Sequence, residues 1–323
     1  MRPQHLIFAL VMAAAAGTNW VASKIAVDTL PPLLTVAMRF AILSIALSPF
    51  ARVFKGQMVN VFLVAVTLGV VQFGFMFQSL SLSEDVSTMA IANQLYVPFS
   101  TILGVIFLGE RIGWVRSVAI AIAFGGVVVM GFDPAALRQF DAMVFVILSA
   151  MSLSISSLFM RKLSGIKVFQ LQFWLAFLAF PQMLLLSLIF EFDRWVAVPS
   201  ASAIAWYCFI YTIFVGTLFH AGWYFLLRRY PISTVAPLML LLPVAGIGSG
   251  VVVYGDVLSS QVILGGALTL LCTLVFLCHL CLTGFVHRAG VCCGEESDEK
   301  AICLGICVML VLIAILTLYG IAA

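Results

Sequence analysis

Long apolar stretches alternate with short polar connections along almost the whole chain. Each stretch is about 20 residues long, the length that an α-helix needs to cross a bilayer core roughly 30 Å thick. The pattern predicts ten membrane-spanning helices and, after a charged segment, an eleventh apolar run at 301–323. The predicted helices lie at 4–22, 31–50, 58–80, 86–108, 112–131, 141–160, 167–190, 202–227, 232–254 and 260–284. Apolar and polar residues do not alternate within these runs, which excludes a membrane β-barrel.

A pattern of prolines, glycines and acids recurs once, offset by about half the chain, which indicates that one unit was duplicated. The order is Pro98, Gly109, Glu110, Gly125 and Gly126 in the first copy, and Pro243, Gly255, Asp256, Gly265 and Gly266 in the second. Because each unit holds an odd number of predicted helices, the second must enter the bilayer upside down relative to the first. Inverted repeats around a site at the membrane centre are typical of secondary transporters.

The predicted fold class is therefore an all-α membrane protein with a ten-helix inverted 5+5 repeat and one extra C-terminal helix. The predicted domains are a first five-helix repeat at 1–132, an inverted second repeat at 140–284, and a tail at 285–323. Only Cys208 precedes residue 272, whereas the remaining cysteines crowd into the end of the chain. This abrupt change of composition suggests that the charged loop and last helix were appended or fused, and it leaves open whether they are native.

Composition agrees with a membrane protein. The chain is 64% hydrophobic and 9% charged, with a mean hydropathy of +1.21, whereas soluble domains carry roughly 25% charged residues. The net charge of +3 does not point to nucleic acid, because the basic residues are spread over the connections. With a cytoplasmic N-terminus, most of these residues fall on the predicted cytoplasmic side, as membrane orientation requires. The first helix is not expected to be a cleaved signal, because polar residues lead into a second span without an exported domain.

Neutral polar and aromatic side chains recur inside the predicted spans and indicate a substrate pocket near the membrane centre. Interhelical hydrogen bonds and an interfacial aromatic belt are competing explanations for the same residues. Ser87 and Gln94 fall on one helical face, an arrangement suited to lining a pocket. The candidate substrate-binding residues are Asn19, Trp20, Gln72, Gln78, Ser87, Asn93, Gln94, Tyr96, His220, Trp223 and Tyr224.

Helix-breaking residues within the spans free backbone groups to bend or to coordinate a substrate. The candidate hinge or gating residues are Pro98, Pro237, Pro243, Gly246 and Gly248.

Charged residues in or beside the spans are candidates for structural roles, namely Arg39, Glu110 and Asp256. A guanidinium inside a span needs protein, water or a partner. Arg39 is therefore expected either to bind backbone carbonyls or to attract a substrate carboxylate. Lys24 is expected to reach the outer interface by snorkelling.

No enzyme is expected, because the chain lacks both a nucleophile paired with a base and a metal-binding pattern such as H-E-x-x-H. Neither a metal nor a cofactor is expected. Cys278, Cys281 and their neighbours fit free thiols or a lipidation site better than zinc, since no second C-x-x-C pair stands at a matching distance. The first ten predicted helices contain no carboxylate at mid-membrane depth, which disfavours proton coupling through an acid. The transport mechanisms that remain are passive transport, exchange, and transport coupled through His220.

Several segments resemble both halves of the EamA-type transporters of the drug/metabolite transporter superfamily. They are AGTNWVASKIAV (16–27), PPLLTVAMRF (31–40), FLGERIG (107–113) and GWYFLLRRYPISTVAPLMLLLPVAG (222–246). The resemblance covers roughly residues 5–275, and the family includes bacterial exporters of amino acids and related metabolites. It implies ten helices, cytoplasmic termini and a central cavity lined by helices 1, 3, 4, 6, 8 and 9. The run at 301–323 departs from this pattern.

The expected function is export of small metabolites, most of all amino acids or related zwitterions, across the bacterial cytoplasmic membrane by alternating access. The expected partners are a small-molecule substrate and the lipid bilayer, without nucleic acid. A non-transporting receptor or scaffold, and a transporter of nucleotide, sugar-type or drug substrates, are the alternatives. The sequence leaves open the substrate, the direction and coupling of transport, and the oligomeric state.

Overall fold

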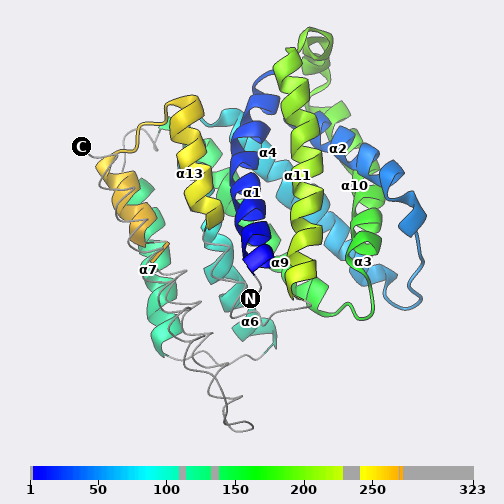
Figure 1. The fold of residues 1–323 in the computed structure, drawn as a ribbon, viewed down its shortest axis with the longest axis horizontal. Coiled ribbons are helices and arrows are strands. Elements are labelled where there is room, and N and C mark those ends of the chain that lie inside the picture. The colour runs from blue at the N-terminus through cyan, green and yellow to red at the C-terminus, as the bar shows by residue number, and fades with distance from the viewer. Residues whose placement is uncertain (1–2, 109–113, 132–137, 228–240, 269, 272–323) are drawn as a thin grey trace.

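The long apolar runs fold as helices in the computed structural model, which confirms the predicted all-α class (Figure 1). The structure describes residues 3–108, 114–131, 138–227, 241–268 and 270–271. The α-helices are α1 (Pro3–Thr29), α2 (Pro32–Ala46), α3 (Met58–Val64), α4 (Phe73–Leu82), α5 (Ser87–Ala92), α6 (Tyr96–Leu108), α7 (Trp114–Gly131), α9 (Phe140–Arg161), α10 (Val168–Phe190), α11 (Ala203–Leu227) and α13 (Leu241–Tyr254). A further helix occupies 260–268. The predicted tail at 285–323 lies outside the described residues.

Shorter segments of other helix types join or interrupt these helices. They are η1 (Ser48–Phe50), the π-helical η2 (Ala65–Gln72), η3 (Asn93–Leu95) and η4 (Phe192–Ser200). The helices α3, η2 and α4 form one continuous span, and α5, η3 and α6 form another. The 3-10 turn η3 precedes Pro98, which has no N–H to donate to the carbonyl of Gln94 four residues earlier. The interruption of this span therefore has a cause in the sequence.

Five described helices are long and apolar enough to cross a membrane. A sixth crossing results if η4 and the following part of α11, which meet at 108°, count as one bent span. The spans are Ile7–Thr29, Met58–Leu82, Ser87–Phe107, Phe140–Met160 and Val168–Phe190. The multi-pass membrane architecture is confirmed, while the number of ten crossings stays a prediction.

Within the described ranges, two helix boundaries differ from the predicted ones by more than two residues. Helix α1 continues past 22 to Thr29, because the Lys24 ammonium pairs with the Asp28 carboxylate one turn later (2.5 Å), which offsets both charges. The Lys24 side chain is only 6% exposed and its ammonium meets Asp28, so its expected snorkelling to the outer interface stays a prediction. Helix α2 ends at Ala46 instead of residue 50, because Pro49 disfavours helical backbone at the residue before it.

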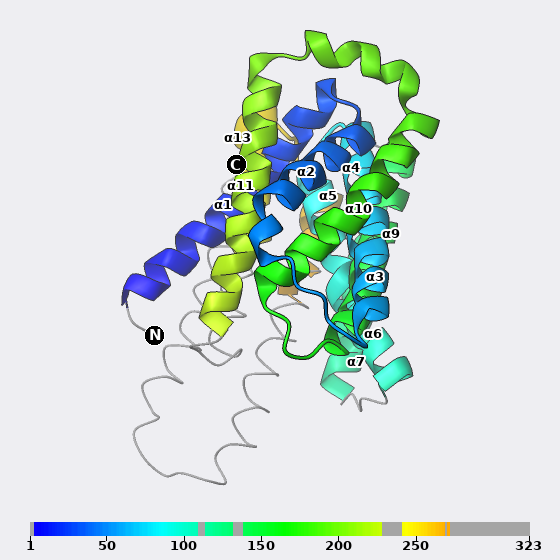
Figure 2. The same ribbon diagram turned by 90° about the vertical axis from the view of Figure 1, so that its right-hand side faces the viewer.

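The first helix of each half packs between helices of the other half. Helix α1 lies against α11 and α13, and α9 lies against the span α3–η2–α4 and the span α5–η3–α6. The second helices of the two halves, α2 and α10, pack against each other (Figure 2). Exchanging the halves leaves this pattern of neighbours unchanged, so the described helices form a pseudo-twofold arrangement.

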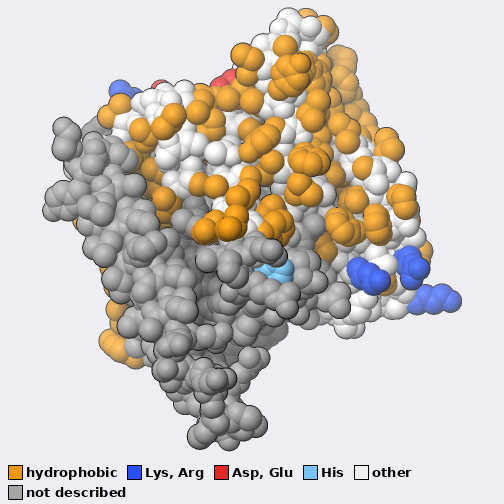
Figure 3. All heavy atoms as spheres, in the orientation of Figure 1, with side chains coloured by type: hydrophobic (Ala, Val, Ile, Leu, Met, Phe, Trp, Pro, Cys, Tyr) orange, Lys and Arg blue, Asp and Glu red, His pale blue; other side chains and the backbone are white. Residues whose placement is uncertain are grey.

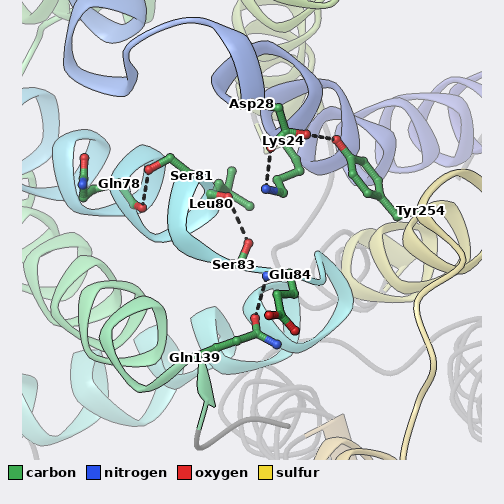
Figure 4. A network of polar contacts seen from close by, with 9 residues as sticks. All are labelled: Lys24, Asp28, Gln78, Leu80, Ser81, Ser83, Glu84, Gln139 and Tyr254. Carbon is green, nitrogen blue, oxygen red and sulfur yellow. Dashed lines mark hydrogen bonds and ion pairs between the residues drawn. The ribbon is translucent and has the colours of Figure 1, made fainter. Parts of the chain in front are cut away.

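The two halves run in opposite directions. The end of α1 and the start of α9 lie at the same end of the bundle, which we call the capped end (Figure 4). There Asp28 of α1 accepts a hydrogen bond from the Tyr254 hydroxyl (2.6 Å). The neighbouring Gln139, which precedes α9, accepts from the Glu84 N–H (2.8 Å). Because α1 ends where α9 begins, the second half is inverted relative to the first.

The surface separates charge from apolar side chains. In Figure 3, hydrophobic side chains cover much of the described face, basic side chains gather at the lower right, and acidic side chains show near the top. The exposed acids at the capped end include Asp28 and Glu84, which share that end with the exposed Arg138 and Arg194. Arg52, Lys55, Lys162 and Lys167 lie in the connections at the opposite end. A band of apolar surface between two charged rims is the surface expected of a membrane protein.

Candidate functional site

Helix α1 presents Asn19 and Trp20 near its contact with α13. The Asn19 side-chain oxygen is buried and has no hydrogen-bond partner among the described residues. Trp20 is half-buried against the main apolar core, and Gly246 of α13 lies beside its ring. Gly17 allows this close approach, because a Cβ there would overlap Ala245 of α13. The two predicted residues therefore sit where the halves meet.

Gln72 at the end of η2 joins the first half to α9. Its Nε2 donates to the Ser149 hydroxyl (3.3 Å), and that hydroxyl donates to the Gln72 backbone carbonyl (3.1 Å). The amide oxygen is buried without a partner in the described part of the chain. Half of the Gln72 amide thus makes an interhelical hydrogen bond, and its oxygen is left as a free acceptor.

The 3-10 turn η3 carries Asn93 and Gln94 into the middle of their span. The Asn93 side-chain oxygen is buried and lacks a partner within the described ranges. Gln94 is half-buried, and no described residue bonds to its side chain. The backbone carbonyl of Tyr96 accepts from the Ser154 hydroxyl of α9 (2.8 Å), while its ring packs on the apolar core. Pro98 and this turn place two polar side chains at the same depth.

Ser87 belongs to a helix cap formed with Asp256. The Asp256 carboxylate oxygen accepts from the Val86 N–H (3.1 Å), the Ser87 N–H (2.9 Å) and the Ser87 hydroxyl (2.6 Å). All three residues are buried. Farther along the same face, Ala90 packs against Gly246. The face expected to line a pocket therefore packs against α13 here, which favours the interhelical explanation for Ser87 and the structural one for Asp256.

The remaining candidates differ in what the structure describes. Gln78 is half-buried, its backbone carbonyl accepts from Ser81 (2.9 Å), and its amide makes no hydrogen bond to a described residue (Figure 4). Gly248 faces open space. Glu110 and Pro237 lie outside the described residues. His220, Trp223, Tyr224 and Pro243 lie in α11 or α13, but the placement of their side chains is not described.

Arg39 of α2 is buried. It faces two spans: the span α3–η2–α4, which follows α2, and α11, which follows α10. Its guanidinium carbon lies 5.0 Å from the centre of the Phe73 ring. One terminal nitrogen packs directly on Gly216 of α11, where a Cβ would overlap it. The Arg39 Nε is buried and has no partner among the described residues. The expected hydrogen bonds from Arg39 to backbone carbonyls are absent from the described part of the chain.

Sequence reasoning missed Glu191, which caps α2 from the other half of the protein. One of its carboxylate oxygens accepts from the N–H groups of Leu33 (2.9 Å) and Leu34 (3.2 Å), and from the Ser187 hydroxyl (3.3 Å). Burial raises the pKa of the Glu191 carboxyl, although these donors favour its ionised form. The sequence feature that could have indicated this cap is Pro31, the residue before α2, because its side chain cannot cap the helix.

Two further features complete the inventory. The Gln172 amide oxygen is buried without a partner in the described ranges, although the sequence did not single it out as a site residue. Among the described residues, no group of three His, Cys, Asp or Glu side chains could hold a metal ion. The chemistry that the described site offers is therefore hydrogen bonding by neutral amides and one buried cation.

Comparisons with known proteins agree with these features. Residues 4–132 and 141–278 each match the EamA-like transporter family. A "Probable amino-acid metabolite efflux pump" of Salmonella typhimurium is 26% identical over 273 residues, which are 80% of this chain and 90% of that protein. The protein of the same name in Escherichia coli is 26% identical over 275 residues, with 81% and 91% covered. "Uncharacterized transporter YdeK" of Bacillus subtilis is 27% identical over 238 residues, with 70% and 80% covered.

Proposed function

The chain belongs to the EamA-like transporter family, and from this premise we propose that it exports amino acids or related zwitterions by alternating access. The proposed membrane is the bacterial cytoplasmic membrane, with the N-terminus in the cytoplasm. The proposed domains are the five-helix repeats at 1–132 and 140–284. The two relatives named as amino-acid metabolite efflux pumps support export and the substrate class. The basic connections at the end opposite the capped end support the orientation.

The observation that carries the proposal is a set of buried acceptors without donors. Asn19, Gln72 and Asn93 each hold an amide oxygen that is buried and unpartnered within the described residues. A buried polar atom left without a hydrogen bond costs about 1–3 kcal/mol. Such atoms persist where a ligand or water completes them. Acceptor oxygens suit the ammonium group of an amino acid, which offers three N–H donors.

Alternating access requires one end of the bundle to open while the other stays closed. At the capped end the halves are joined by buried contacts of Asp256 with Ser87 and of Glu191 with Leu33. At the opposite end, Gln57 and the Ser164 backbone exchange two hydrogen bonds that are exposed to solvent (3.2 and 2.9 Å). Buried, charge-assisted hydrogen bonds are the stronger kind. This asymmetry supports a conformation closed at the capped end.

The test is counterflow of radiolabelled amino acids into liposomes that contain the purified full-length protein. We expect Gln72→Leu and Asn93→Leu to lower the flux about tenfold, because each removes one acceptor for the substrate. Gln182→Leu is the matched control, since the Gln182 amide donates to the Leu178 carbonyl of its own helix (2.8 Å) and bonds to no other described residue. Wild-type flux in both site variants would remove these residues from the site. A wild-type protein that moves no amino acid would overturn the proposed substrate class.

A further inference from the structure

Arg39 is a buried cation without a counter-charge among the described residues. It is 5% exposed, and its Nε has no hydrogen-bond partner in the described ranges. The ion pair found there joins Lys24 to Asp28 and does not involve Arg39. Arginine stays ionised in proteins, and removing an ion from water without a partner is unfavourable. Either the charge serves a purpose or the fold requires a large side chain at this position.

The surroundings of Arg39 hold its tip in one place. Phe73, at the start of α4, lies beneath the guanidinium and makes a cation–π contact. Gly216 of α11 leaves room for a terminal nitrogen that a Cβ would displace. The side chain thus reaches from α2 to the third span of its own half and to α11, the third helix of the other half. The family resemblance assigns both of these helices to the wall of the central cavity.

The pseudo-twofold arrangement supplies an internal comparison. In the other half, Gly69 of η2 receives two apolar residues of α10. A Cβ on that glycine would overlap the Cβ of Ala179 and would lie 3.5 Å from the Cδ2 of Leu175. Exchange of the halves replaces α2 by α10 and α11 by the span that contains η2. Gly69 is therefore the counterpart of Gly216, and Ala179 and Leu175 together make the contact that Arg39 makes in the first half. Because apolar side chains fill the equivalent contact, packing the second helix of a half against a glycine of a third helix does not require a charge.

We propose that Arg39 binds the carboxylate group of the transported substrate and thereby determines specificity for substrates with an anionic end. This inference rests on the proposed function and deepens it. The planar guanidinium presents donors in a fork that matches a carboxylate, and its Nε is still unpartnered. Together with the acceptor oxygens of Asn19 and Asn93, one buried cation suits a zwitterion better than a simple amine.

The first test measures anion binding without relying on transport. Purified full-length protein is titrated with phenylacetate or with phenylacetamide at constant ionic strength, and its melting temperature is followed, since ligands stabilise the state that binds them. We expect phenylacetate, but not phenylacetamide, to raise the melting temperature of the wild type. Arg39→Gln should weaken the apparent affinity for phenylacetate about tenfold or more. The affinity of Arg39→Lys should lie between those of the wild type and Arg39→Gln. Leu175→Gln places the same new side chain in the counterpart contact and should keep the wild-type response.

A second variant moves the guanidinium without removing its charge. Gly216→Ala places a methyl group where the terminal nitrogen of Arg39 lies. We therefore expect it to weaken phenylacetate binding as Arg39→Gln does. A purely structural arginine predicts the opposite, namely that Arg39→Gln lowers the melting temperature of the ligand-free protein but leaves the preference for phenylacetate intact. That result, or a wild type that responds equally to both probes, would overturn the inference.

Transport then separates this inference from the proposed function. A wild type that responds to phenylacetate but moves no amino acid retains the Arg39 site and loses the proposed function. Conversely, the wild type could transport amino acids while folded Arg39→Gln protein shows unchanged flux. These two results together would retain the proposed function and remove the assignment of Arg39.

Discussion

Replacing Asp256 should destabilise the protein and loosen the capped end. Its carboxylate is 8% exposed and accepts from the N–H groups of Val86 and Ser87 and from the Ser87 hydroxyl. Each buried donor left without an acceptor costs about 1–3 kcal/mol. Asp256→Ala leaves three such donors, so we expect a loss of about 3–9 kcal/mol. Asp256→Asn keeps the shape but not the charge, and about 2 kcal/mol is expected, because neutral hydrogen bonds are roughly half as strong.

Thermal unfolding of the purified protein in detergent measures this loss. In a chain of this size about 1 kcal/mol corresponds to roughly 2–4 °C, so Asp256→Ala should lower the melting temperature by about 6 °C or more. Asp193→Ala is the control, since Asp193 is exposed and bonds to no described residue; about 0.5 kcal/mol or less is expected. A melting temperature for Asp256→Ala equal to that of the control would refute this account of the cap.

The same variant tests the cap as a gate. Met89 is fully buried just inside the cap, so Met89→Cys should react slowly with a membrane-impermeant maleimide. In the Asp256→Ala background the cap lacks its acceptor, and faster labelling is expected. Equal labelling rates in the two backgrounds would show that the Asp256 contact does not control opening.

Three further predictions concern packing, pH and the helix interruption. Gly17→Leu should cost about 2 kcal/mol or more, because its side chain overlaps α13; Gly125→Leu faces open space and should change the melting temperature little. As pH rises above the range in which glutamate ordinarily titrates, the melting temperature of the wild type should fall relative to that of Glu191→Gln. The reason is that a carboxyl whose pKa is raised in the folded state binds more protons there, so stability falls with pH; a parallel pH dependence of the two proteins would contradict this. Pro98→Ala restores an N–H for the Gln94 carbonyl and should slow counterflow without lowering the melting temperature. Unchanged flux would show that the interruption η3 is not needed for transport.

The positions of the helices could be predicted from the sequence because they depend on local properties. A span must be apolar over a length set by the bilayer, and α10 (Val168–Phe190) lies within one residue of its predicted start. The inversion of the halves followed from counting spans in the repeat. The limits of α1 were less accessible, because the Lys24–Asp28 pair lets a helix continue through two charges that hydropathy treats as its end.

The roles of the polar residues could be predicted only in part. Helical periodicity correctly placed Ser87 and Ala90 on one face, but it did not tell whether that face meets a pocket or another helix. In the structure the neighbour of this face is α13, and the hydroxyl of Ser87 bonds to Asp256. By contrast, Gln72 and Asn93 keep an amide oxygen without a described partner. Residues of similar chemistry on neighbouring spans thus differ in what remains free to bind.

The sequence by itself determined the class of protein, the helical segments, the duplication and the family, because apolar length and recurring motifs are written along the chain. The tertiary structure decided which polar groups are already bonded and which are not. Asp256 meets Ser87, and Glu191 meets Leu33, across more than a hundred residues, while Arg39 meets a glycine and a ring but no counter-charge among the described residues. Such pairings depend on how helices from the two halves pack, and hydrogen bonds between distant segments form only where that packing brings donor and acceptor within about 3 Å.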